Sequence, residues 1–135
     1  MDTTQPIKID GRQFHGITQE LSAAQDDYLI GQLRLAGALE LLLAAQKNPE
    51  EHKAEALLTQ ILVSGRAPQI LAGCLTEDGK KWTHAEAERN ATVFAAVTNA
   101  EDKQSMRGAI VGFVVGFFQY ATAFARTSPK SSPLN

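Results

Sequence analysis

Cysteine is nearly absent from this chain, because Cys74 is the single cysteine among 135 residues. An internal disulfide and a zinc site built from several thiolates are therefore excluded. Cys74 itself has apolar neighbours and no adjacent base, which favours a buried thiol over a nucleophile. Residues 1–8 also lack the basic-then-apolar order of a secretory signal, so we expect a cytoplasmic protein.

An excess of charge of one sign is also missing. Thirteen Lys and Arg face fifteen Asp and Glu, which gives a formal net charge of −2. A protein that binds nucleic acid by neutralising phosphates normally has a basic excess or a basic stripe. We therefore expect no nucleic-acid partner.

Clusters of reactive side chains are missing as well. The histidines His15, His52 and His84 are far apart in the sequence, whereas a metal site usually contains at least one closely spaced pair. The acidic pairs 50–51 and 101–102 fall in the first turns of expected helices, where the helix dipole accounts for them. The sequence therefore predicts no enzyme, no metal ion and no cofactor.

Glycines do not form a phosphate-binding loop. Gly108, Gly112 and Gly116 are spaced by four residues inside an expected helix. A phosphate loop needs clustered glycines directly before a helix. These three residues instead form a small-xxx-small pattern, which is typical of closely packed helices.

A short β-hairpin is expected at the front of the chain, over residues 7–17. Apolar and polar residues alternate on both sides of Asp10-Gly11, a pair that favours a two-residue turn. A lone hairpin is marginally stable in water, so its apolar side chains must pack on helices or on another subunit. These side chains are Ile7, Ile9 and Phe14.

Helical periodicity and capping residues predict five helices in the rest of the chain. The first begins at Ser22, where Ser22 and Gln25 fit a capping box, or one turn earlier at Thr18, and its apolar second half, 35–45, is expected to be enclosed. Asn48, Thr83 and Thr98 are the expected caps of later helices. The expected helices cover 22–45, 49–64, 68–75, 84–97 and 99–125.

These elements define one mainly α domain. Residues 1–6 are polar and expected to be flexible, and the Ser- and Pro-rich tail 127–135 is expected to be disordered. Between them, 7–126 contains neither a repeat nor a linker. The expected architecture is a compact domain of about five helices with a small N-terminal β-hairpin.

The most unusual segment is 108–125, in which eighteen residues pass without a charge. It fits a membrane helix, a partner-binding helix or the central helix of an all-α core. Eighteen residues is near the short limit for a span of about 30 Å of hydrocarbon, and Gln119, Tyr120 and Thr122 dilute its last third, so a membrane is disfavoured.

The two faces of this helix are both apolar. A small domain has difficulty covering both, so the helix is either central or in part a docking surface, and both interpretations remain open. One face carries Ile110, Phe113, Val114, Phe117, Ala121 and Phe124, and the other carries Val111, Val115, Phe118 and Thr122.

Two stretches resemble a known family. Residues 7–14 lead through 18–27 into a leucine-rich helix, and 71–83 contains the turn Gly79-Lys-Lys-Trp82 before a capped helix. In order and size, residues 7–107 resemble the small tail assembly chaperones of long-tailed phages and prophages. The resemblance implies a short β start and a helical body, without catalysis. It also implies that the protein coats the long helical tape-measure protein until tail-tube subunits replace it.

The resemblance and the apolar segment together suggest a binding surface for the client or for a second copy. We expect a homo-oligomer whose protein partners are the tape-measure protein and the tail-tube protein. Two alternatives are a structural virion subunit, such as a tail or head–tail connector component, and a small membrane protein spanned by 108–125. The candidate partner-binding residues are Ile110, Phe113, Val114, Phe117, Phe118 and Phe124.

Overall fold

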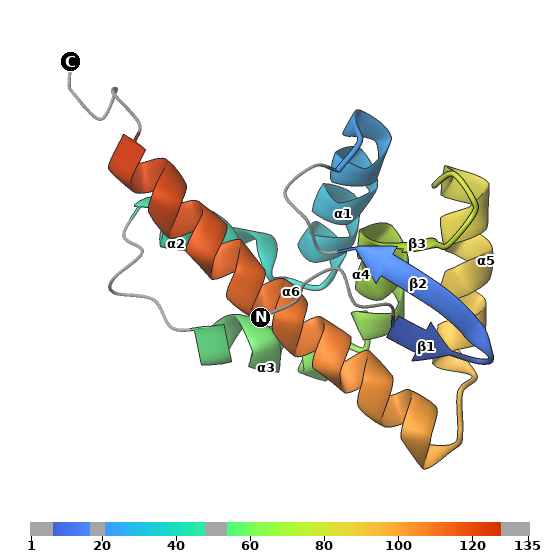
Figure 1. Ribbon diagram of the computed structural model, residues 1–135. Coiled ribbons are helices and arrows are strands. Elements are labelled where there is room, and N and C mark those ends of the chain that lie inside the picture. The colour runs from blue at the N-terminus through green and yellow to red at the C-terminus, as the bar shows by residue number, and fades with distance from the viewer. Residues whose placement is uncertain (1–6, 17–20, 48–53, 128–135) are drawn as a thin grey trace.

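The computed structural model describes residues 7–16, 21–47 and 54–127, and it places the side chains of all of these except 45–46 and 117–127. These residues form six helices and one three-stranded antiparallel sheet, which confirms the mainly α fold with a β start. The elements, shown in Figure 1, are β1 (Ile7–Ile9), β2 (Arg12–Gly16), α1 (Ala23–Leu35), α2 (Leu39–Lys47), α3 (Ala54–Ser64), α4 (Ala67–Cys74), β3 (Leu75–Glu77), α5 (His84–Ala95) and α6 (Ala100–Thr127).

The predicted hairpin is confirmed in β1 and β2. Asp10 and Gly11 form its turn with φ of 56° and 75°, and Ile7 lies opposite Phe14. Ile9 and Phe14 are buried, and the Phe14 ring meets the ring of Phe94 in α5 edge to face, with 5.3 Å between centroids. The hairpin is thus stabilised by helices of the same chain.

A third strand, β3, was not predicted. It pairs with β2, and Gly16 lies opposite Leu75. A Cβ at position 16 would lie 2.2 Å from the Cys74 carbonyl oxygen, so only glycine allows this approach of the two backbones. Three residues are too few for an alternation to be recognised, and β3 forms because β2 already presents an edge.

The prediction of one continuous helix over 22–45 is wrong. Gly37 adopts a φ of 74° and ends α1 in a left-handed cap. The amide of Ala38 donates to the Leu33 carbonyl oxygen at 2.9 Å. The amide of Gly37 donates to the Arg34 carbonyl oxygen at 3.0 Å. Leu35 and Leu43 are exposed, so the segment 35–45 is not enclosed as expected.

The predicted cap of the first helix is confirmed. The Gln25 amide donates to Ser22 Oγ at 3.1 Å, and the Ser22 amide donates to Gln25 Oε1 at 3.2 Å. Gln25 Nε2 also donates to the Gly73 carbonyl oxygen at 3.1 Å. Gln25 therefore takes part in the cap and also links α1 to α4.

The other predicted caps have mixed outcomes. Thr83 caps α5, because its Oγ1 accepts from the Glu86 amide at 3.1 Å. The cap of α6 is Asn99 and not Thr98, since Asn99 Oδ1 accepts from the Asp102 amide at 2.8 Å. The predicted Asn48 cap and the two terminal segments lie outside the described residues.

The core is centred on α4. Residues 70–75 are all buried, and α4 packs against α1, α5 and α6 (Figure 1). Cys74 is the buried thiol that was expected, and its burial raises its pKa above the usual range. Trp82 docks on the same centre, because its Nε1–H donates to the Ala72 carbonyl oxygen at 2.9 Å. The helix α6 crosses this core and also contacts α2, α3 and β1.

Candidate functional site

The long helix α6 buries one of its two apolar faces. Ile110, Phe113 and Val114 are 2%, 4% and 1% exposed and belong to the core of the chain. For these three residues the partner-binding hypothesis is corrected, and the alternative of a core helix holds. The other candidates, Phe117, Phe118 and Phe124, lie outside the residues whose side chains are described.

The second apolar face of α6 is open to solvent where its side chains are described. Val111 and Val115 are 45% and 43% exposed. They lie one helical turn apart and therefore on the same side of the helix. Among the five predicted face residues whose side chains are described, one face is buried and the other is exposed, as Ile110 and Val111 illustrate.

A single row of side chains continues this open face toward the start of α6. Lys103, Arg107, Val111 and Val115 follow one another at intervals of four residues, and all four are exposed. Over twelve residues this row extends about 18 Å along the helix. The cationic half lies outside the uncharged run 108–125 and was therefore not predicted as part of this face.

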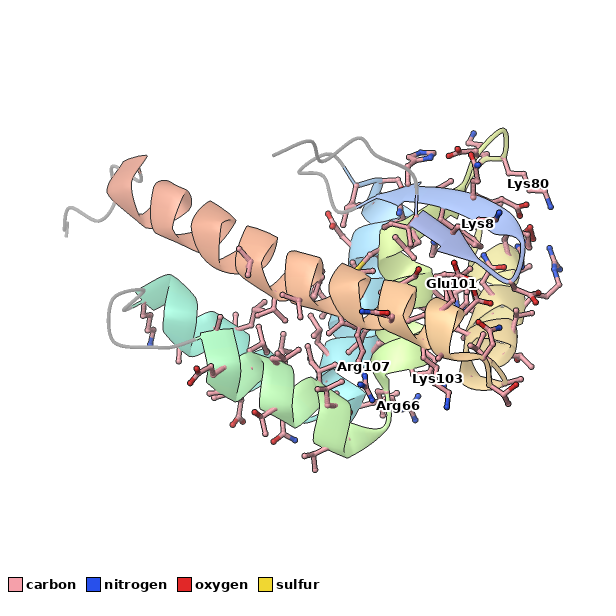
Figure 2. All side chains as sticks on the ribbon, turned by 60° about the horizontal axis from the view of Figure 1, so that its bottom comes forward. Lys8, Arg66, Lys80, Glu101, Lys103 and Arg107 are labelled. Atoms are coloured by element: carbon pink, nitrogen blue, oxygen red, sulfur yellow. The ribbon has the colours of Figure 1, made fainter. Side chains whose placement is uncertain are left out.

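The cations of this row have no acidic partner among the residues that the structure describes. Neither Lys103 nor Arg107 forms an ion pair or hydrogen bond with any described side chain. Figure 2 shows both on one side of α6 and Glu101 on the other. Glu101 is two residues from Lys103, which places the two on different helix faces.

Open space lies next to this row. A Cβ added at Gly108 would meet no other atom within 4 Å, apart from its own chain neighbours and the helix backbone nearby. Gly108 lies between Arg107 and Val111, so another helix could approach the α6 backbone closely here. We define the α6 face as Lys103, Arg107, Gly108, Val111 and Val115.

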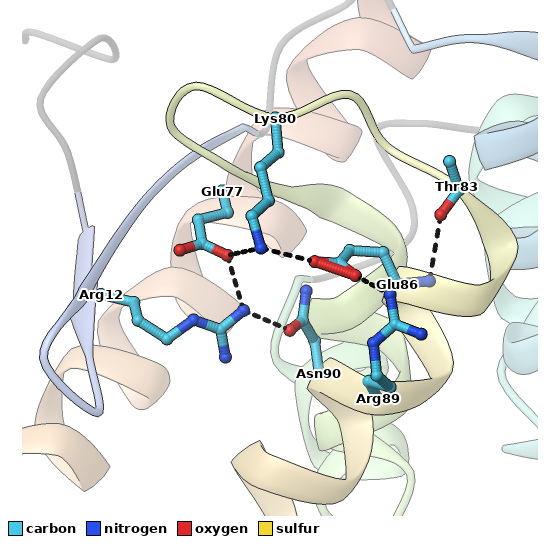
Figure 3. A network of polar contacts seen from close by, with 7 residues as sticks. All are labelled: Arg12, Glu77, Lys80, Thr83, Glu86, Arg89 and Asn90. Atoms are coloured by element: carbon cyan, nitrogen blue, oxygen red, sulfur yellow. Dashed lines mark hydrogen bonds and ion pairs between the residues drawn. The ribbon is translucent and has the colours of Figure 1, made fainter.

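A second constellation consists of polar side chains that join the hairpin to α5 (Figure 3). Arg12 Nη2–H donates to Glu77 Oε1 and to Asn90 Oδ1, both at 2.7 Å. Asn90 is buried, and the Arg12 guanidinium lies over the Phe14 ring. The hydrogen bond from Arg12 holds the pKa of Glu77 below its usual range, and the same contact raises the pKa of Arg12.

Lys80 and Arg89 are the other two cations of this network. Lys80 Nζ lies 3.4 Å from Glu77 Oε1 and donates to Glu86 Oε2 at 3.1 Å. Arg89 pairs with Glu86, and the contacts with Arg89 and Lys80 lower the pKa of Glu86. Each charge in the network faces a charge of opposite sign, so we assign the network the structural role of fastening β2 and β3 to α5.

The two described histidines are accounted for by local contacts. His15 Nδ1 lies 2.7 Å from Asp78 Oδ1 at the surface, and the ring of His84 meets that of Tyr28 at 5.2 Å. His52 lies outside the described residues. Within the described part of the chain, no group of three or more His, Cys, Asp or Glu side chains is arranged to hold a metal ion.

Comparison of this chain with protein-family models, with curated proteins and with solved structures found no match. A search of the residues that the structure describes found no helix with both the length and the hydropathy needed to cross a membrane.

Proposed function

We propose that this protein is a non-catalytic chaperone that binds a helical protein client through the α6 face. The client class is the one that the sequence resemblance implies, the tape-measure protein of a long-tailed phage or prophage. The observation that carries the proposal is the contrast along α6. Ile110, Phe113 and Val114 are sealed in the core, while Val111 and Val115 lie exposed on the same helix.

The size of the apolar contact suits a temporary association. Complete burial of one valine side chain contributes about 1.5 kcal/mol. Val111 and Val115 are already about half buried in the chain, so covering the rest contributes on the order of 1–2 kcal/mol in total. One such contact is weak, and tail-tube subunits could displace it. Many copies along one long client would supply the avidity that a single copy lacks.

The order of elements supports the same proposal. The resemblance implies a short β start followed by a helical body, and the chain folds in that order. The polar network of Arg12, Glu77 and Asn90 holds the β start against α5. On α6, the buried Ile110 and Val114 anchor the helix in the core, so the α6 face is presented to solvent.

Co-expression with the tape-measure protein tests this function. The wild-type chain should keep the tape-measure protein in the supernatant, and the V111Q/V115Q variant should leave it in the pellet. Glutamine has a higher helix propensity than valine and carries no charge, so the variant should retain the fold, which circular dichroism checks. The matched control is V63Q, because Val63 on α3 is 76% exposed and lies about 200° around that helix from the buried Ile61.

Two outcomes would contradict the proposal. One is that V111Q/V115Q solubilises the tape-measure protein as well as the wild type does. The other is that the chain is present in purified tails in fixed stoichiometry, which would favour the structural virion subunit.

A further inference from the structure

The α6 face has two chemically different halves. Lys103 and Arg107 form the half near the start of the helix, and Val111 and Val115 form the other half. A row of residues at intervals of four is one of the ridges by which helices pack into the grooves of other helices. A helix laid against this ridge would meet two cations at one end and two apolar side chains at the other.

Near the sheet and α5, three described cations have carboxylate partners, whereas Lys8 and Lys81 there, like Lys103 and Arg107, form no ion pair with a described residue. Arg12, Lys80 and Arg89 each pair with Glu77 or Glu86. The described part of α6 contains two carboxylates, those of Glu101 and Asp102. Glu101 lies on another face of the helix, and Asp102 is already hydrogen-bonded. Its Oδ2 accepts from the Asp10 amide at 3.0 Å and from Asn99 Nδ2 at 2.9 Å. Within the described ranges of the chain, Lys103 and Arg107 therefore have no carboxylate partner.

A second copy of the chain does not supply such a partner when the two α6 faces pair with each other. Parallel pairing of two α6 helices would place Lys103 and Arg107 against the same residues of the other copy. Antiparallel pairing would place them against the run 108–125, which contains no charge. In both arrangements the cations would meet no carboxylate, so charge disfavours self-association through this face.

We propose that the α6 face binds an amphipathic helix that carries acidic side chains at one end of its apolar stripe. The acidic end lies over Lys103 and Arg107, and the apolar stripe covers Val111 and Val115. Gly108, between the two halves, allows the backbones to approach. This inference rests on the proposed function for the existence of a helical client, and it adds the charge pattern of the client and its direction along α6.

Two synthetic helical peptides test the charge pattern. Each is about 20 residues long, enough for an isolated helix, and both have the same leucine stripe. One carries two glutamates a helical turn apart at one end of the stripe, and the other carries two lysines there. Fluorescence anisotropy should show the acidic peptide binding about fivefold tighter than the basic one, as two exposed ion pairs would provide. Added salt should reduce the difference.

Charge reversal on the protein provides the internal check. The K103E/R107E variant should invert the preference and bind the basic peptide more tightly. The control R34E/K81E changes the net charge equally through exposed residues outside α6, and it should keep the wild-type preference. Equal affinity for the two peptides, a preference that the control also inverts, or binding of neither peptide would overturn the inference. The co-expression result with V111Q/V115Q would still decide the proposed function separately.

Discussion

Ile110 and Val111 are neighbours in the sequence, but Ile110 lies in the core of the domain and Val111 lies on its surface. Ile110 is 2% exposed and Val111 is 45% exposed. Successive residues of an α-helix are about 100° apart, so one uncharged run can contribute to a core and to a surface at once. Where its side chains are described, the run that begins at residue 108 is therefore core on one side and exposed to solvent on the other.

Truncation of these two neighbours should have very different effects on stability. Ile110→Ala removes buried methyl groups and should lower the free energy of unfolding by about 2–5 kcal/mol. Val111→Ala should change it by less than about 0.5 kcal/mol, because the side chain is half exposed. Urea denaturation followed by circular dichroism measures both. Similar losses in the two variants would contradict the assignment of the faces.

Two glycines should respond to alanine in opposite directions. At Gly16 a Cβ would lie 2.2 Å from the Cys74 carbonyl oxygen, so Gly16→Ala must separate β2 from β3 and lower the melting temperature. At Gly31 in α1 a Cβ would meet nothing within 4 Å, so Gly31→Ala should stabilise the helix by about 0.5–1 kcal/mol. A stable Gly16→Ala variant would show that the third strand is placed wrongly.

Tyr28 carries a buried hydroxyl, and its removal should have little effect on the free energy of unfolding. Its Oη has no hydrogen-bond partner among the described residues, and burial raises its pKa. Its ring meets that of Trp82 edge to face, with 5.7 Å between centroids, a contact that Tyr28→Phe retains. The variant should leave the free energy of unfolding unchanged or raise it by up to about 1 kcal/mol.

Trp82→Phe is the comparison for this variant. It removes the hydrogen bond from Nε1 to the Ala72 carbonyl oxygen and leaves a buried acceptor unpaired. A loss of about 1–3 kcal/mol is expected. If Tyr28→Phe cost as much as Trp82→Phe in thermal denaturation, the Tyr28 hydroxyl would have a partner that the structure does not show.

Acid should weaken the contact between the hairpin and β3. The Arg12 guanidinium lowers the pKa of Glu77 in the folded state. A carboxyl whose folded pKa is depressed contributes stability above its unfolded pKa of about 4.3, and this contribution is lost as the pH falls through the folded value. The free energy of unfolding should therefore fall below about pH 4.3, and Glu77→Gln should flatten this fall.

Arg12→Gln should flatten the same acid transition, since it removes the cause of the pKa shift. The double variant with Glu77→Gln should add little to either single change, because both act through one contact. Urea denaturation at a series of pH values measures all three. An acid dependence in Glu77→Gln that equals that of the wild type would contradict this role of Glu77.

Local signals in the sequence were sufficient to predict the elements whose ends are marked by turn or capping residues. Asp10-Gly11 marks the hairpin turn, Ser22 and Thr83 mark helix starts, and Gly65 follows directly after α3. These features act within a few residues, so spacing along the chain reveals them.

Features that depend on distant partners were not predictable in this way. The strand β3 exists because β2 lies beside it. The end of α1 uses local hydrogen bonds, but a single glycine in an apolar run does not by itself end a helix. Gln60 Nε2, from α3, also donates to the Ala36 carbonyl oxygen at 2.8 Å there. The exposure of Val111 likewise depends on which side of α6 the rest of the domain covers. The sequence could define two apolar faces but had no information on their burial.

Site-specific photocrosslinking tests most directly whether the α6 face holds the client. Benzoylphenylalanine would replace Val111 in cells that express both the chain and the tape-measure protein, and Val63 in a matched control. The account predicts an ultraviolet-dependent adduct with the tape-measure protein from position 111 and little or none from position 63. No adduct from position 111, or equal adducts from both positions, would contradict it.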